Sequence, residues 1–214
     1  MKPIVIAALA LFLGVAPAVA QTPPNAKATT ATTQRVVLAG GCFWGMQLVF
    51  ESLKGVTSAT AGYAGGNAMT AHYDIVSTGM TGHAESVEVT YDPSVISFSK
   101  LLDVYFTVAH DPTELNRQGP DDGTQYRSEI YYTTPQQRQE ALNYIARLTH
   151  ERKFSDPIVT KVESFRGFYA AEGYHQNYAL HNMQDPYIAQ NDLPKLHALR
   201  QDFPALVKAG TPSP

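Results

Sequence analysis

From Arg35 onward the sequence alternates short strand-like segments with longer helical ones, and this alternation restricts the possible folds more than any other feature. Alternating and β-branched residues predict strands over 35–38, 56–63, 86–91, 127–132 and 158–165. Apolar residues at helical spacing predict helices over 43–53, 97–109, 136–152 and 193–202. Because several strands alternate as strands with one buried face do, we predict an α/β (α+β) two-layer sandwich, a ferredoxin-like plait with a mixed sheet.

The first 20 residues have the features of a secretory signal peptide. Lys2 precedes an apolar run over 4–15, and the residues Ala18-Val19-Ala20 fit the small-x-small pattern that is cleaved before Gln21. The run is shorter than the roughly 20 residues that span a bilayer as a helix, which disfavours the alternative of an uncleaved membrane anchor. We therefore expect a periplasmic or secreted protein, with no membrane attachment once residues 1–20 are removed.

The rest of the chain has the length of one domain with short flanking segments. Residues 21–33 (QTPPNAKATTATT) contain one charge and no large apolar side chain, so we predict a disordered linker. The domain is expected over 34–208, with a flexible tail over 209–214. The formal charge of −3 becomes −4 when Lys2 is removed, which argues against a nucleic-acid-binding protein. No feature of the sequence requires a partner subunit, so a monomer is expected.

Cys42 is the only cysteine of the chain. A single thiol excludes an intramolecular disulfide, a thiolate zinc site and an iron–sulfur cluster. It lies in GGCFWG between a predicted strand and a predicted helix, where unpaired N–H groups and the helix dipole stabilise a thiolate. The glycines allow a tight turn that leaves the sulfur uncovered. A buried structural cysteine is the alternative, but this position favours a nucleophile with a lowered pKa.

Glu85 is the candidate proton donor for a reaction at Cys42. It stands where a glycine-containing loop enters a predicted strand, so its side chain can point inward beside apolar residues. Burial would raise the pKa of this carboxyl and keep it protonated near neutral pH, as a general acid requires. Judged on local sequence alone, an exposed carboxylate at a strand end is the alternative.

Other candidates lie beside the cysteine and in two predicted loops over 65–82 and 111–125. Tyr73 and Tyr126 can donate a hydrogen bond to a polarised oxygen, although tyrosines more often serve packing. Asp121 stands in a DDG sequence that also fits a simple turn. Phe43 and Trp44 either wall an apolar pocket for a small alkyl group or belong to the core. The seven histidines show no metal-ligand spacing, so no metal site is predicted.

Five motifs in one order resemble the peptide methionine sulfoxide reductase A family. They are GCFWG at 41–45, GYAGG at 62–66, TGHAE at 81–85, GTQYRS at 123–128 and YHQNY at 174–178. The resemblance extends from about Arg35 to Pro204, nearly all of the expected domain. Five ordered motifs are far more specific than any one of them, and the sequence is identified as a secreted, one-cysteine member of this family.

The resemblance implies a two-layer α/β fold and reduction of the S epimer of methionine sulfoxide, free or in proteins, as a repair of oxidised proteins. By matched positions, Cys42 attacks the sulfoxide sulfur and Glu85 protonates the sulfoxide oxygen. The other matched residues contact that oxygen (Tyr73, Tyr126), the substrate main chain (Asp121), the S-methyl group (Phe43, Trp44) or the surroundings of the substrate (His175).

The sequence departs from the family pattern in its cysteines and at a few nearby positions. Many members have further cysteines that attack the sulfenic acid of the nucleophile, and this chain has none. The resemblance then implies a Cys42 sulfenic acid reduced by an external thiol, such as thioredoxin or a glutaredoxin-like protein, with no other cofactor. Gln47, Ala71-His72 and Ser77 replace a frequent Glu, Pro-Thr and Cys. Gln47 changes local hydrogen bonding, and loss of the Pro is expected to loosen the loop of Tyr73.

Two functions of other classes use the same residues. A thiol hydrolase or acyltransferase would pair Cys42 with His83 or His175 as base, and would act on amides or esters without a reductant. A non-catalytic secreted binder would hold oxidised methionine or peptides and release no product. The natural reductant, and the preference for free or protein-bound methionine sulfoxide, are left open by the sequence.

Overall fold

The structure, a computed structural model, describes residues 1, 3 and 32–212, and the account below concerns 32–212. Almost all of the predicted signal peptide and linker therefore lies outside the described residues, as do the last two residues of the predicted tail. No helix in the described part of the chain has the length and apolar character needed to cross a bilayer.

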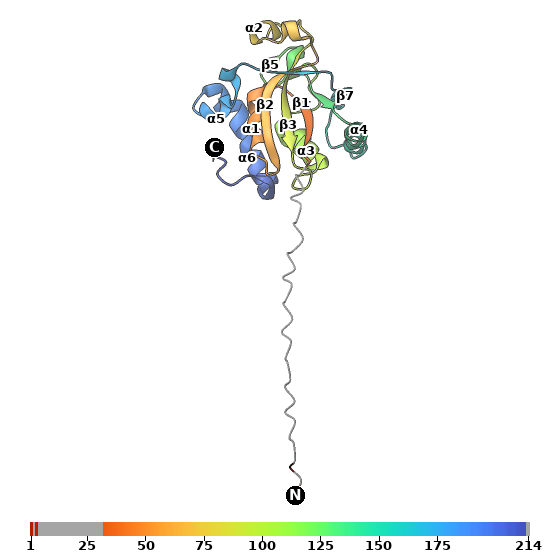
Figure 1. Ribbon diagram of the computed structural model, residues 1–214. Helices are drawn as coiled ribbons and strands as arrows, with labels where there is room; N and C mark the ends of the chain where they lie inside the picture. Colours follow the sequence, from red (N-terminus) through yellow and green to blue (C-terminus); the bar gives the residue numbers. More distant parts are fainter. Residues whose placement is uncertain (2, 4–31, 213–214) are drawn as a thin grey trace. The chain divides into compact units, whose positions relative to one another are not determined.

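A six-stranded mixed sheet lies at the centre of the domain (Figure 1). Its order is β7-β6-β1-β3-β2-β8, and only the outer pair β6–β7 is parallel. In the four strands β6-β1-β3-β2, β2 runs parallel to β1 with β3 between them, which is the arrangement of a ferredoxin-like plait. The predicted fold class is confirmed. The strands are Gln34–Ala39 (β1), Val56–Ala64 (β2), Ala84–Tyr91 (β3), Glu129–Tyr132 (β6), Lys161–Ser164 (β7) and Phe168–Ala170 (β8).

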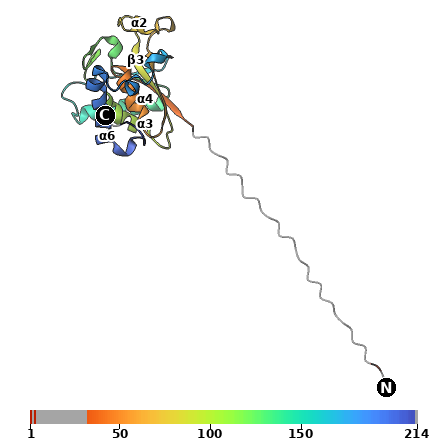
Figure 2. The same ribbon diagram turned by 90° about the vertical axis from the view of Figure 1, so that its left-hand side faces the viewer.

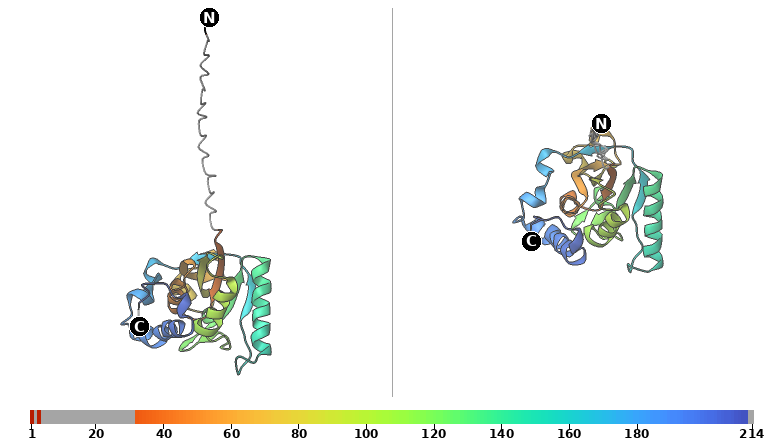
Figure 3. Two further views of the ribbon diagram at one scale, coloured as in Figure 1. Left: turned by 90° about the horizontal axis from the view of Figure 1, so that it is seen from below. Right: turned by 60° about the horizontal axis from the view of Figure 1, so that its bottom comes forward.

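Helices pack against the sheet and against one another. Helix α1 contacts β2, β3 and α6, whereas α4 contacts α3, β6 and β7. The long helix α4 and the C-terminal residues lie on opposite sides of the domain (Figure 3), and α2 stands at the top in Figures 1 and 2. The helices are Phe43–Glu51 (α1), Tyr73–Val76 (α2), Phe98–Val104 (α3), Pro135–His150 (α4), Tyr178–His181 (α5) and Leu193–Asp202 (α6).

Alternating residues of the central strands form the core below the helices. Ile130, Leu38, Val87 and Ala61 stand side by side across four strands, and all are fully buried in the main core cluster. The intervening residues, such as Val37, belong to a smaller cluster on the other face of the sheet. Each buried aliphatic side chain of this kind contributes about 1.5–3 kcal/mol, so this row fixes the register of the sheet.

The structure adds short elements that the sequence analysis missed. The predicted loop over 65–82 contains α2, and the loop over 111–125 contains a ribbon of two strands, β4 (Arg117–Gln118) and β5 (Asp121–Asp122). Strand β8 and helix α5 lie between the predicted strand over 158–165 and the predicted helix over 193–202, where no element was predicted. The helices among them are about one turn long and the strands have two or three residues, so they leave no periodic signal.

Candidate active site

Cys42 and Glu85 are brought together by the antiparallel pairing of β1 with β3. The last residue of β1, Ala39, stands opposite Ser86, so the chain leaves β1 beside the start of β3. Cys42 then caps the N-terminus of α1. Because Glu85 shares its strand face with Val87 in the core below the helices, its side chain points to this terminus. The backbone N–H of Phe43 donates a hydrogen bond of 3.1 Å to Glu85 Oε2.

The thiol of Cys42 is buried, with 8% of the residue exposed. Burial raises its pKa well above the ordinary value, and the nearby carboxylates of Glu85 and Asp192 raise it further. The backbone N–H of Trp44 and the Lys195 ammonium lower it, but by less. The predicted lowering by the helix terminus is therefore wrong for the free protein, because desolvation outweighs the helix N–H groups. The resting residue is a thiol.

Glu85 has the protonation state that a general acid needs. It is 2% exposed, and burial raises its pKa to about 8 from an ordinary value of 4.5. The hydrogen bond from Phe43 lowers the pKa and the Asp121 carboxylate raises it, both by less than burial. The carboxyl group is consequently protonated at neutral pH, as its position in the sequence predicted.

Tyr73 and Tyr126 face the same centre from two different segments. Burial, with smaller effects of the charges of Glu85 and Cys42, raises the pKa of Tyr73 to about 12. Burial also raises the pKa of Tyr126, with added effects of Glu85, Asp121 and Cys42. Since charge effects fall with distance, both hydroxyls lie near the nucleophile and the acid. Both phenols stay protonated at neutral pH and can donate hydrogen bonds.

An aromatic group lies beside Cys42 on the first turn of α1. Trp44 Nε1 donates to His175 Nδ1 at 3.1 Å, and its indole stacks on Tyr178 with ring centroids 4.1 Å apart. The His175 ring also packs 5.0 Å from Phe43 and 4.4 Å from Tyr73. These contacts make an apolar wall next to the thiol, which suits a methyl group. The sequence analysis missed Tyr178 as part of it.

Asp121 lines a small pocket with the thiol, together with residues that no local pattern singled out. The Tyr187 hydroxyl donates to the Asp121 carboxylate. Lys195 Nζ donates to Asp192 Oδ1 at 3.2 Å, and both residues act on the pKa of Cys42. Asp192 directly precedes α6 and Lys195 lies in α6. The sequence of this segment predicts only a helix. Thus the structure brings all eight predicted site residues together and adds Tyr187, Asp192 and Lys195.

Two glycines next to Cys42 have conformational and steric reasons to be glycine. Gly41 has φ +94°, in the left-handed region that favours glycine. Gly45 leaves room for the buried ion pair, because a Cβ there would lie 2.0 Å from Asp192 Oδ1 and 2.9 Å from Lys195 Nζ. In the GGCFWG motif, Gly41 therefore allows the turn before Cys42, and Gly45 allows Asp192 and Lys195 to pack closely against α1.

We expect Gly45→Ala to destabilise the protein by about 1–3 kcal/mol, the usual effect of overpacking. In an open helix the same change stabilises by roughly 0.5–1 kcal/mol, so the sign identifies the clash with Asp192. Urea unfolding measures the difference. Gly173→Ala is the matched control, because a Cβ at Gly173 meets nothing within 4 Å. A Gly45→Ala protein as stable as the parent would contradict the packing described above.

Of the two histidines considered as bases for a hydrolase, His83 has contacts at both ring nitrogens, whereas His175 has a hydrogen bond at Nδ1 and a buried Nε2 without a hydrogen-bond partner in the described residues. His83 Nε2 lies 3.0 Å from Asn67 O, and its Nδ1 accepts from the Gly66 N–H at 3.3 Å. His175 uses Nδ1 to accept from Trp44. Within residues 32–212 no hydrogen bond joins a histidine to the Cys42 thiol. The geometry therefore does not support the thiol hydrolase.

The departures from the family pattern are accommodated by specific hydrogen bonds. Gln47 Nε2 donates to Ala59 O at 2.8 Å, and Gln47 Oε1 accepts from the Asn177 N–H at 2.8 Å. The amide thus ties α1 to β2 and to the segment of His175. The backbone N–H of Tyr73 donates to Glu172 Oε1 at 3.1 Å. This contact ties the start of α2 to the segment of His175, and the loosening expected from loss of the Pro stays a prediction.

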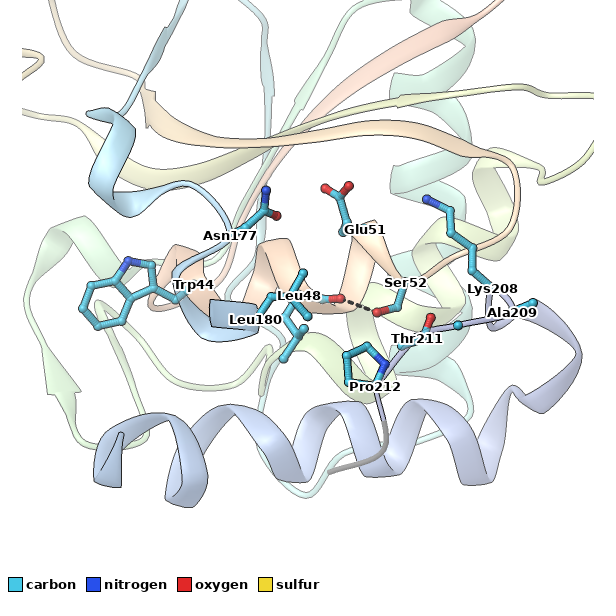
Figure 4. A pocket seen from close by; sticks show the side chains of 11 residues that line it. Trp44, Leu48, Glu51, Ser52, Asn177, Leu180, Lys208, Ala209, Thr211 and Pro212 are labelled. Atoms are coloured by element: carbon cyan, nitrogen blue, oxygen red, sulfur yellow. Dashed lines mark hydrogen bonds between the residues drawn. The ribbon is translucent and has the colours of Figure 1, made fainter. Parts of the chain in front are cut away.

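A pocket of about 220 Å³ borders Trp44, but neither Cys42 nor Glu85 lines it (Figure 4). It lies between α1, α5 and residues 208–212, with Trp44 at one end and Lys208 toward the other. Arg200 donates to the carbonyls of Thr211 and Pro212, so these residues of the predicted tail have partners here. The flexibility of the tail stays a prediction.

In the described residues no group of three His, Cys, Asp or Glu side chains is placed to hold a metal ion.

Comparison with known proteins agrees with this geometry. A family model described as peptide methionine sulfoxide reductase matches residues 34–206. The chain is similar to peptide methionine sulfoxide reductase MsrA 2 of Mesorhizobium japonicum, with 53% identity over 174 residues, 81% of this chain and 89% of that protein. It is also similar to MsrA 2 of Synechocystis, with 48% identity over 186 residues, 86% of this chain and 87% of that protein.

Solved structures show the same fold. The reduced form of Mxr1 from Saccharomyces cerevisiae has a TM-score of 0.68 and 34% identity, over 72% of this chain and 88% of that one. Methionine sulfoxide reductase A of Corynebacterium diphtheriae has a TM-score of 0.62 and 36% identity, over 71% of this chain and 76% of that one.

Proposed function

The chain belongs to the peptide methionine sulfoxide reductase family and reduces methionine sulfoxide to methionine, and we propose that it does so on the S epimer with Cys42 as nucleophile and Glu85 as acid. One observation carries the assignment of these roles. A carboxyl group that burial keeps protonated lies against the backbone of the residue that follows the only thiol. A sulfoxide needs both groups, because its oxygen leaves the sulfur only when it is protonated.

The first step oxidises Cys42 and reduces the substrate. The thiol sulfur attacks the sulfoxide sulfur, Glu85 gives its proton to the sulfoxide oxygen, and the thiol proton passes to the Glu85 carboxylate. The oxygen moves from the substrate to Cys42, so the net products are methionine and a Cys42 sulfenic acid. The raised pKa of Cys42 next to the Glu85 carboxylate fits this proton exchange, because each group holds a proton more tightly when the other is ionised.

The second step needs thiols from another molecule, because Cys42 is the only cysteine. One external thiol attacks the sulfenic acid, water leaves, and a mixed disulfide forms. A second external thiol then releases Cys42 as a thiol and leaves as part of a disulfide. A dithiol protein of the thioredoxin or glutaredoxin type can supply both thiols.

Tyr73 and Tyr126 are assigned to hydrogen bonds with the sulfoxide oxygen. We expect Tyr73→Phe and Tyr126→Phe each to lower kcat/KM by about 10- to 100-fold, because hydrogen bonds to a group that develops charge contribute roughly 1.5–3 kcal/mol. Steady-state assays of methionine formation test this. Tyr132→Phe serves as control, since Tyr132 lies on β6 outside the site. Equal activity of all three variants would remove the two phenols from the reaction.

The activity itself is tested with separated epimers. We expect protein starting at Gln21, with a small dithiol, to form methionine from L-methionine-S-sulfoxide and none from the R epimer, as measured by chromatography. Turnover of the R epimer alone, or of neither by folded protein, would contradict the proposed function. Turnover of amides or esters without a reductant would instead support the hydrolase.

The N-terminal sequence supports a further part of this proposal, namely that the enzyme acts in the periplasm or outside the cell; that it is a monomer is proposed because no feature of the sequence requires a partner subunit. Residues 4–15 and the Ala18-Val19-Ala20 sequence support the location. Expression of the full chain in a Gram-negative host, followed by mass spectrometry of the periplasmic fraction, should find a protein that begins at Gln21. Full-length protein in the cytoplasm would contradict this location, and size-exclusion chromatography reports the oligomeric state.

A further inference from the structure

A small pocket of about 80 Å³ opens directly beside Cys42 and carries charges of both signs. Asp121 supplies a carboxylate and Lys195 an ammonium, and both line the pocket together with the thiol. Neither Glu85 nor the phenols of Tyr73 and Tyr126 line it. The remaining lining residues are Gln118, Gly119, Pro120, Tyr187 and Asn191.

The Lys195 ammonium is held in place by buried structure. It donates to Asp192 Oδ1 at 3.2 Å, and Asp192 is fully buried. It also lies so close to the first turn of α1 that a Cβ on Gly45 would be 2.9 Å from Nζ. An ammonium has three N–H donors, and Asp192 is its one hydrogen-bond partner in the described residues, so donors remain for a ligand in the pocket.

The charge of Lys195 acts on the pocket and on the nucleophile. Burial raises the pKa of Cys42 and of Asp121, and the Lys195 charge opposes both rises, so the three groups are within electrostatic reach of one another. Asp121 is fixed by the Tyr187 hydroxyl. The pocket therefore presents an anchored anion and an anchored cation next to the reactive sulfur.

We propose that Lys195 binds the α-carboxylate of a methionine sulfoxide whose sulfur lies at Cys42, and that Asp121 faces the α-ammonium when the amino acid is free. This inference rests on the proposed function. Only three carbons separate the sulfur of methionine from its carboxyl carbon, so a carboxylate lies near the thiol whenever the sulfur does. The ligand class is a methionine sulfoxide with a free carboxylate, which is either the free amino acid or a C-terminal residue.

A methionine sulfoxide inside a polypeptide has a neutral amide in place of the carboxylate. Hydrogen bonds between two charged groups are roughly twice as strong as neutral ones. We expect the carboxylate substrate to be preferred, with the difference mainly in KM. The preference is the kcat/KM for N-acetylmethionine sulfoxide, which has a free carboxylate, divided by the kcat/KM for its N-methylamide, which has a neutral amide there. Both substrates are used as S epimers. Free methionine sulfoxide represents the free amino acid, and the dipeptide Ala-Met sulfoxide represents a C-terminal residue. Only free methionine sulfoxide has an α-ammonium that adds to binding at Asp121.

The decisive variants remove the charge of Lys195 without leaving Asp192 alone. Asp192→Asn/Lys195→Met should lower the carboxylate-to-amide ratio about tenfold, whereas Asp192→Asn, which keeps the ammonium, should retain the preference. An unchanged ratio in an active double variant would overturn the proposal. The parent protein gives an independent check, because L-methionine should inhibit at lower concentration than methioninamide; equal inhibition would also overturn it. Absence of turnover on every S-epimer substrate contradicts the proposed function instead.

Discussion

Cys42→Ser should abolish methionine formation, with a loss of roughly 10⁴-fold or more in kcat, the scale seen when a covalent nucleophile is removed. A serine hydroxyl is not oxidised to a sulfenic acid, so neither electron transfer from the substrate nor regeneration by external thiols remains. Methionine release after addition of L-methionine-S-sulfoxide, followed by chromatography, measures the loss.

The covalent state of Cys42 gives a second readout of the same prediction. Without reductant, the parent protein should form about one methionine per chain and gain one oxygen atom at Cys42, which mass spectrometry after trapping with dimedone detects. Cys42→Ala should do neither while keeping its fold by circular dichroism. Stoichiometric methionine from Cys42→Ala would place the nucleophile elsewhere, and turnover by the parent without any oxidised Cys42 would contradict the sulfenic acid.

Glu85→Gln should lower kcat/KM by about 10²- to 10⁴-fold, the range that a positioned general acid contributes. Glutamine keeps the shape of the side chain and an oxygen that can accept the hydrogen bond from the Phe43 N–H. It cannot give a proton to the sulfoxide oxygen. Glu88→Gln is the matched control, because Glu88 lies on the same strand and pairs with Arg35 at the surface. Comparable losses in both variants would show that Glu85 acts through structure alone.

The pH dependence of the reaction follows from the same carboxyl group. Its pKa is about 8, and the protonated form is the active one. In the parent, kcat/KM should be level below this pH and fall above it as the carboxyl ionises, by tenfold for each further pH unit. Glu85→Gln should lack this fall. A parent activity that rises through pH 8 would mean that the ionised carboxylate is the active form.

Burial of Glu85 also affects stability. Between pH 4.5 and about 8 the folded protein keeps a proton that the unfolded chain has released, so the free energy of unfolding decreases as the pH rises through this range. Glu85→Gln removes this dependence and should raise the Tm relative to the parent at pH 8, with a smaller difference at pH 4.5. Thermal unfolding at both pH values measures it, and an equal difference at both would contradict the buried, protonated state.

The main elements of the site could be predicted because they depend on short-range patterns. Glu85, Val87 and Val89 alternate with the more polar residues Ser86, Glu88 and Thr90 of the other sheet face, which predicted that the carboxyl points into the core. The change from strand to helix at Cys42 predicted its place at a helix terminus. Lys195 could not be predicted in the same way, because its contact with the first turn of α1 joins residues about 150 positions apart, and the surrounding sequence signals only a helix.

By itself, the sequence determined the two-layer α/β class, the single thiol at the start of α1, the inward carboxyl of Glu85 and, through five ordered motifs, the family; it favoured a plait without fixing the order of the strands. These depend on backbone periodicity, on residue type and on order along the chain. The tertiary structure alone decided the protonation of Cys42 and the placement of a charged pair beside it. Both depend on what surrounds the thiol. Desolvation and charge are set by the elements packed around a group, so a helix terminus that favours a thiolate in isolation holds a neutral thiol once β3 and α6 enclose it.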